Sequence, residues 1–144
     1  MKVLFVCHGN ICRSPMAEGM LRQACAKRGL GWQIDSAGLS AEHSGEDMHP
    51  NTKKILSLHG AYFKHSARQI LPSDSEFDLI LAATRYQARL LQKRFPNSNI
   101  QTMLPDADVP DPWYGTYADY EAVYAMLEPM IEQLVLESAD GSKA

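Results

Sequence analysis

The sequence predicts an α/β fold in which a four-stranded parallel sheet carries helices on both faces. Short apolar segments at residues 2–6, 31–36, 78–82 and 99–103 have the length and composition of strands. A segment with apolar side chains at helical spacing follows each of them along the 144-residue chain. Because parallel strands must be joined by crossover connections, this alternation indicates a parallel sheet.

The expected helices show recognisable local signals. In the first, at residues 14–27, Met16, Met20 and Leu21 recur at helical spacing, and Gly29 suits the C-terminal cap. The remaining expectations are helices at 51–58, 85–95 and 118–136 and irregular segments at 38–50, 63–75 and 104–117.

The last helix contains a proline. Pro129 predicts a kink or a break, because proline removes a backbone donor and clashes with the preceding turn. Residues 138–144 are expected to form a frayed tail. With no repeat or linker-like stretch, residues 1–144 are expected to form one domain.

Composition is that of an ordinary globular protein. Hydrophobic residues make up 45%, and 14 Lys and Arg against 17 Asp and Glu give a formal net charge of −3. This balance argues against non-specific nucleic-acid binding, which needs a basic face. The apolar segments are too short to span a membrane, and no signal-peptide pattern precedes the first strand. Three cysteines do not suggest a secretory disulfide framework, so we expect a cytoplasmic protein.

The motif that carries chemistry begins where the first strand ends. Five residues, including Gly9, separate Cys7 from Arg13, and Ser14-Pro15 then opens a helix. A loop at a helix N-terminus favours an anion, and arginine adds a bidentate donor suited to phosphate. The same surroundings stabilise a thiolate. The layout predicts cleavage of a phosphate ester through a cysteinyl-phosphate on Cys7.

This stretch, V-C-H-G-N-I-C-R-S-P-M-A-E at residues 6–18, resembles the phosphate-binding loop of low-molecular-weight protein tyrosine phosphatases. Three further stretches resemble the same family in the same order: D-S-A-G at 35–38, H-S-A-R-Q-I at 65–70 and D-P-W-Y-G at 111–115. The resemblance extends from residue 2 to about residue 136. It implies a flavodoxin-like fold with strand order 2-1-3-4.

The resemblance implies three catalytic residues. Cys7 is the expected nucleophile, and Arg13 is expected to hold two equatorial phosphate oxygens. A carboxyl group would protonate the phenolic leaving group and later activate water. Spacing alone leaves Asp106, Asp108 and Asp111 open as that acid. The match of residues 111–114 to the family's acid loop favours Asp111.

Further residues are expected to support the loop. Ser14 can donate a hydrogen bond to the Cys7 sulfur, and it can equally be only an N-cap. By resemblance, Asn10 holds the loop backbone with His65 as its partner, and His8 occupies a variable position that faces substrate. The residues expected to bind phosphate or support the loop are His8, Gly9, Asn10, Ile11, Cys12, Ser14 and His65.

Two aromatic residues and a second thiol complete the expected site. Trp113 and Tyr114 are expected to flank a slot that admits a flat phenyl phosphate and keeps shorter phosphoserine from the nucleophile. In the family, a thiol at the position of Cys12 can form a reversible disulfide with the nucleophile, which makes Cys12 a candidate redox residue. Cys25 is expected in the core.

The chain departs from the family pattern at two places. An acid that often helps to position the arginine is missing near Thr84-Arg85, so that support must come from elsewhere. Met48-His49-Pro50 replaces a common Asp-Pro-Arg.

Competing interpretations are weaker. Arsenate reductases share this fold and loop but relay electrons through downstream cysteines, and none follows Cys25. A non-catalytic phosphotyrosine-binding module predicts loss of Cys7, Arg13 or the acid, and a sugar-transport phosphocarrier would not need the 111–114 motif. We therefore expect a tyrosine phosphatase that needs no metal or other cofactor. Its expected partner is a phosphotyrosine-containing protein, with no nucleic acid or membrane, and its expected state is a monomer or weak dimer.

Overall fold

Four parallel strands form one sheet in the order β2-β1-β3-β4. The strands are β1 (Lys2–Cys7), β2 (Gln33–Gly38), β3 (Leu79–Ala82) and β4 (Ile100–Thr102). The computed structural model describes residues 1–139. The predicted α/β fold and strand order are confirmed.

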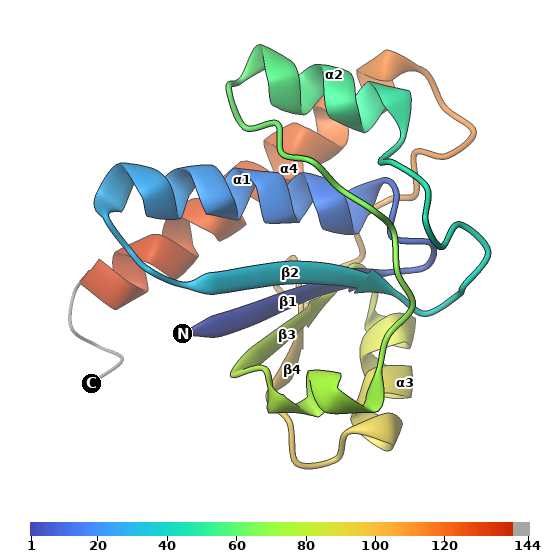
Figure 1. Cartoon of the computed structure of the whole chain (residues 1–144), viewed down its shortest axis with the longest axis vertical. Coiled ribbons are helices and arrows are strands. Elements are labelled where there is room, and N and C mark those ends of the chain that lie inside the picture. The colour runs from blue at the N-terminus through green and yellow to red at the C-terminus, as the bar shows by residue number, and fades with distance from the viewer. Residues whose placement is uncertain (140–144) are drawn as a thin grey trace.

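Helices cover both faces of this sheet (Figure 1). Three of them, α1 (Arg13–Arg28), α2 (Pro50–Leu58) and α4 (Tyr117–Ala139), pack together on one side. On the opposite side lies α3 (Arg85–Arg94). A short 3₁₀ helix, η1 (Pro72–Glu76), lies within a segment that we expected to be irregular.

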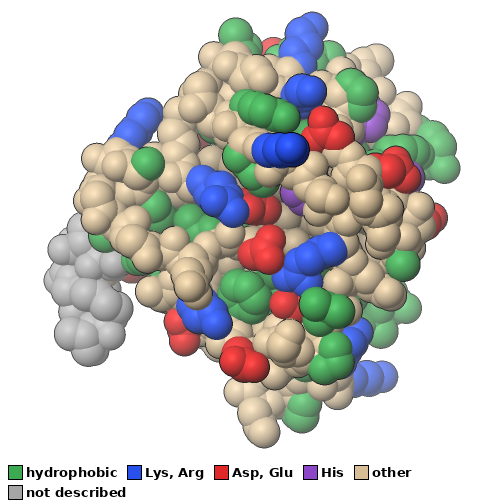
Figure 2. All heavy atoms as spheres, in the orientation of Figure 1, with side chains coloured by type: hydrophobic (Ala, Val, Ile, Leu, Met, Phe, Trp, Pro, Cys, Tyr) green, Lys and Arg blue, Asp and Glu red, His purple; other side chains and the backbone are tan. Residues whose placement is uncertain are grey.

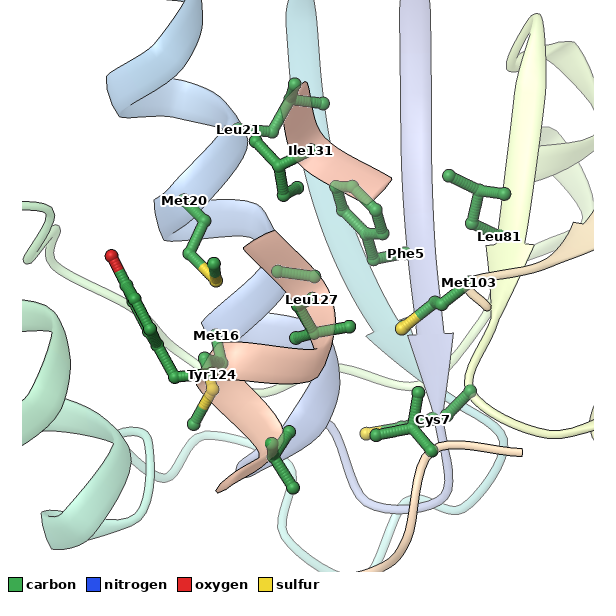
Figure 3. Close-up of a cluster of buried hydrophobic side chains, with 14 of the residues drawn as sticks. Phe5, Cys7, Met16, Met20, Leu21, Leu81, Met103, Tyr124, Leu127 and Ile131 are labelled. Carbon is green, nitrogen blue, oxygen red and sulfur yellow. The ribbon is translucent and has the colours of Figure 1, made fainter. Parts of the chain in front are cut away.

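The core divides into two layers because successive strand residues point to opposite faces. Val3 and Phe5 of β1 pack towards α1 and α4, whereas Leu4 and Val6 pack towards α3, where they meet Leu91. Figure 3 shows the first layer, with Phe5 facing the side chains of α1 and α4.

The structure differs most from the predicted elements at β2 and along α4. β2 begins and ends two residues later than expected, because its pairing with β1 continues to the Cys7–Gly38 pair. Of the kink or break expected at Pro129, the break is wrong: α4 is one helix, and the buried side chains of Leu127 and Ile131 anchor it on both sides of the proline. The helix continues to Ala139, so residues 138 and 139 are helical, and the rest of the expected tail, 140–144, lies outside the described residues.

The surface carries charges of both signs. Acidic and basic side chains alternate across the face drawn in Figure 2. Within residues 1–139, no helix combines the length and the apolar composition needed to cross a bilayer.

Candidate active site

The loop after β1 carries most of the predicted site residues. β1 ends at Cys7 and α1 begins at Arg13, so the loop lies at the N-terminus of the helix. Cys7 and Arg13 are only 2% and 5% exposed, yet both line a cleft of about 380 Å³. Figure 3 shows Cys7 at the carboxyl end of β1. The other lining residues are His8, Gly9, Ile11, Cys12, Glu42, His43, Asp111, Trp113 and Tyr114.

A larger groove of about 1060 Å³ lies between β4 and α4, with Met103 and Met130 in its lining. Of the candidate residues named from the sequence, it contains only Asp106, one of the three acids that spacing left open. Ligands of open α/β sheets bind beyond the carboxyl ends of the strands, which is where the smaller cleft lies. The smaller cleft is therefore the candidate active site.

Asn10 holds the loop in an uncommon backbone conformation. It is fully buried with φ at 61°, in the left-handed region. Its Oδ1 accepts a hydrogen bond from the Arg68 backbone N–H at 3.0 Å, which identifies Nδ2 as the donor group. Nδ2 donates to the hydroxyls of Ser14 and Ser36, each at 2.9 Å. The Asn10 carbonyl accepts from His65 Nε2 at 2.8 Å, so the structure brings these two residues together.

The Ser14 hydroxyl is directed at the sulfur of Cys7. Its Oγ lies 3.0 Å from Sγ. Because Oγ already accepts from Asn10, its single proton is available to the sulfur. A donor in this position stabilises the negative charge of a thiolate.

The second hydroxyl to which Asn10 donates, that of Ser36, contacts a buried carboxylate. Ser36, on β2, donates to Glu18 Oε1 at 2.6 Å, and Glu18 Oε2 accepts from Arg22 Nε at 2.7 Å. Burial raises the pKa of Glu18, against the opposing effect of the Ser36 hydrogen bond and the Arg22 charge. The Ser14 proton is therefore directed at the Cys7 sulfur, and the Ser36 proton is directed at Glu18.

Arg68 ties this network to the scaffold. Its guanidinium donates to both carboxylate oxygens of Asp74 and to Asp35, each at 3.0 Å. The backbone N–H that contacts Asn10 is therefore fixed between β2 and η1.

Arg13 is held by a backbone group. Nη1 donates to the Val109 carbonyl at 2.9 Å, and Nη2 lies 3.7 Å from Asp111 Oδ2. Val109 is itself fixed, since its N–H donates to the Ala83 carbonyl at 2.8 Å. The Val109 carbonyl therefore supports Arg13 in place of the acid that is missing near Thr84. Arg13 Nε is buried without a partner among the described residues, which leaves a donor for an anion.

The structure places Asp106, Asp108 and Asp111, which sequence spacing left open as the general acid, in three different surroundings. Asp111 lines the cleft. Asp108 accepts hydrogen bonds from the backbone N–H and Nε of Arg85, at 2.8 and 3.2 Å, and chiefly the backbone bond lowers its pKa. Asp106 lines the larger groove instead.

Cys12 faces the cleft from beside the nucleophile. Its Sγ lies 3.4 Å from the Tyr120 hydroxyl, and burial raises the pKa of Cys12 to about 12. Burial likewise raises the pKa of Tyr120 above its ordinary value of 10.0. All three cysteines of the chain are free thiols, and Cys25 is buried in the core as expected.

Comparison with known proteins identifies the family. Residues 2–143 match the family described as low molecular weight phosphotyrosine protein phosphatase. The chain belongs to this family. A low molecular weight protein-tyrosine-phosphatase of Streptomyces coelicolor is 38% identical over 88% of this chain and 87% of its own length. One of Bacillus subtilis is 39% identical over 94% of each chain.

Solved structures agree with the family assignment. A protein tyrosine phosphatase from Entamoeba histolytica superposes with a TM-score of 0.91 at 31% identity, covering 99% of both chains. A Drosophila arginine phosphatase superposes with a TM-score of 0.90 at 31% identity, covering 96% of this chain and 98% of its own.

Some residues of this phosphatase site were missed in the sequence. Ser36 and Glu18 lie inside motifs that resemble the family, but no spacing rule connects a strand serine to a helix glutamate. At Gly38 an added Cβ would lie 2.8 Å from the His8 carbonyl, so only glycine fits there, and this close approach appears only in the structure. Glu42 and His43 belong to a segment without periodicity, and only the path of the chain brings them to the cleft.

Proposed function

We propose that the protein hydrolyses phosphotyrosine in protein substrates through a cysteinyl-phosphate intermediate. The observation that carries the proposal is that Cys7 and the buried Arg13 line one cleft, with the Ser14 hydroxyl behind them at 3.0 Å from the Cys7 sulfur. Family membership and the names of the relatives support it.

In the first step, the Cys7 thiolate attacks phosphorus while the aryl P–O bond breaks. Arg13 holds two non-bridging oxygens, for which Nε has a free donor. The Asp111 carboxyl transfers its proton to the departing phenolate oxygen, so the leaving group departs as a neutral phenol.

In the second step, water attacks the phosphoenzyme and the S–P bond breaks. The Asp111 carboxylate takes a proton from that water, and inorganic phosphate and the thiolate are released. The Ser14 hydrogen bond stabilises the sulfur as it leaves. The enzyme then returns to its starting protonation state.

The cleft wall favours an aromatic substrate. Trp113 and Tyr114 are 37% and 97% exposed and both line the cleft, so neither is a core residue. Two rings beside an apolar Ile11 suit a phenyl group. Because a Drosophila arginine phosphatase is also similar, phosphoarginine is the alternative substrate to test.

The test is hydrolysis of an aryl phosphate with chelator present and thiols reduced, for the wild type and Cys7→Ser. Turnover by the wild type alone is expected. Paired peptides with phosphotyrosine or phosphoarginine should then show faster release of phosphate from phosphotyrosine. An inactive wild type would overturn the proposal, and a preference for phosphoarginine would reassign the substrate.

A further inference from the structure

Glu42 is a charged cleft residue that the proposed chemistry does not use. The Asp, Glu, Lys and Arg side chains that line the described cleft are Arg13, Glu42 and Asp111. The proposed mechanism uses Arg13 for phosphate and Asp111 for proton transfer. Glu42 repels a phosphate dianion, so its place in the lining calls for a different role.

The carboxylate of Glu42 lies at the mouth of the cleft. Its side chain is 54% exposed, whereas Cys7 and Arg13 are buried. Oε1 lies 3.1 Å from His8 Nε2 and 3.8 Å from His43 Nε2. This oxygen therefore lies beside two imidazole rings.

The segment that carries Glu42 rests directly on the phosphate-binding loop. Leu39 N–H donates to the Cys7 carbonyl at 3.0 Å, and Ser40 N–H donates to the His8 carbonyl at 2.9 Å. The Glu42 N–H in turn donates to Ser40 Oγ at 3.1 Å. Gly9 permits this approach, because an added Cβ would lie 2.9 Å from His43 Cδ2.

His43 completes the anchoring of this segment. Its Nδ1 lies 3.1 Å from Glu46 Oε2, and its ring lies 5.2 Å from that of Trp113. His43 thus links the segment that carries Glu42 to the aromatic residue Trp113 in the lining of the same cleft.

Resting on the proposed function, we infer that Glu42 selects phosphotyrosine substrates that carry Lys or Arg next to the phosphotyrosine. When the phenyl ring fills the slot, the peptide backbone and its flanking side chains lie at the mouth, beside this carboxylate. A flanking cation gains an ion pair there, and a flanking carboxylate is repelled. An exposed pair of this kind changes affinity by about two- to fivefold.

The test compares two phosphotyrosine peptides that differ only in Lys or Glu on either side of the phosphotyrosine. The ratio of kcat/KM for the Lys peptide to that for the Glu peptide is measured at low ionic strength for the wild type, Glu42→Gln and Glu121→Gln. The last variant removes the same charge from an exposed site on α4 outside the cleft lining. We expect a ratio of about two to five in the wild type and Glu121→Gln, falling towards one in Glu42→Gln.

An equal ratio in the wild type and Glu42→Gln overturns the inference. Dissociation constants of the same peptides for the Cys7→Ser variant, with and without Glu42→Gln, test it independently of turnover. If the wild type binds the peptides selectively but does not hydrolyse them, the proposed function is contradicted and the role of Glu42 stands. If it hydrolyses both peptides without selectivity, the proposed function stands and the role of Glu42 is contradicted.

Discussion

The ring of His49 stacks on the ring of Tyr120, with centroids 4.8 Å apart and planes inclined by 21°. The same imidazole meets the ring of Trp113 at 5.5 Å, and its Nδ1 accepts a hydrogen bond from the Asn51 N–H at 3.0 Å, at the start of α2. The His49 backbone N–H donates to the Ile11 carbonyl of the phosphate-binding loop at 2.8 Å. His49 therefore joins the cap of α2, the aromatic wall and the loop.

This arrangement predicts that neutral His49 stabilises the fold. Burial lowers the pKa of His49 below its ordinary value of 6.5, so the unfolded chain takes up the proton first as pH falls. Protonation also converts Nδ1 from an acceptor to a donor and breaks the cap. The stabilisation is complete above pH 6.5 and is lost as pH falls through the lowered value.

Urea unfolding on both sides of that window measures the effect. His49→Asn keeps a capping oxygen and does not titrate, so its free energy of unfolding should fall less steeply with decreasing pH. His49→Phe keeps a stacking ring and loses the cap, and should be about 1 kcal/mol less stable than the wild type above the window. Parallel pH curves for the wild type and His49→Asn would contradict this account.

Asn10 provides a separate test of loop geometry. Asn10→Gly removes every side-chain hydrogen bond but tolerates the positive φ, whereas Asn10→Ala loses the bonds and strains the backbone. We expect both variants to lower kcat by about 100-fold through misplacement of Cys7 and Ser14. Asn10→Ala should be the less stable by about 1 kcal/mol in thermal unfolding. Asn97→Ala, in an exposed turn, is the matched control, and wild-type turnover by Asn10→Gly would refute the prediction.

The sheet and the loop were predictable because their signals are local. The apolar run of β1 ends at Cys7, and the residues that build the loop follow it directly in the chain. The predicted bounds of β2 were two residues too early. Ala37 and Gly38 join the sheet through pairing with β1, which their own sequence does not encode. The uninterrupted α4 likewise depends on packing that outweighs the proline.

The surroundings of the site were less predictable because they depend on distant contacts. His65 and Asp111 were singled out only through family resemblance, since His65 lies 55 positions after its partner Asn10. Resemblance did not extend to His49 and Glu42, where this chain differs from the family or has no motif. Their contacts with Tyr120 and His8 arise from how the segments fold over one another.

Asp111 is predicted to act as a general acid, and its contribution to kcat/KM depends on how easily the leaving group departs without a proton. Asp111→Asn should lower kcat/KM for phenyl phosphate by about 10²- to 10⁴-fold, and should lower it less for p-nitrophenyl phosphate, whose phenolate departs without protonation. Asp106→Asn, on the larger groove, should leave both rates close to those of the wild type. Equal losses for the two substrates in Asp111→Asn would assign this carboxylate a role other than proton transfer.

Cys12 is predicted to protect the nucleophile from irreversible oxidation. Peroxide converts the Cys7 thiolate to a sulfenic acid; the Cys12 sulfur then attacks it, releasing water and forming a disulfide that a thiol reductant reopens. Activity after peroxide and then reductant should return in the wild type and in Cys25→Ser, but should be lost in Cys12→Ser. Since burial raises the pKa of Cys12 to about 12, its thiolate fraction rises with pH across the neutral range. The disulfide, measured by mass spectrometry under alkylating conditions, should therefore form faster at higher pH, and equal recovery of Cys12→Ser and the wild type would show that another group protects the site.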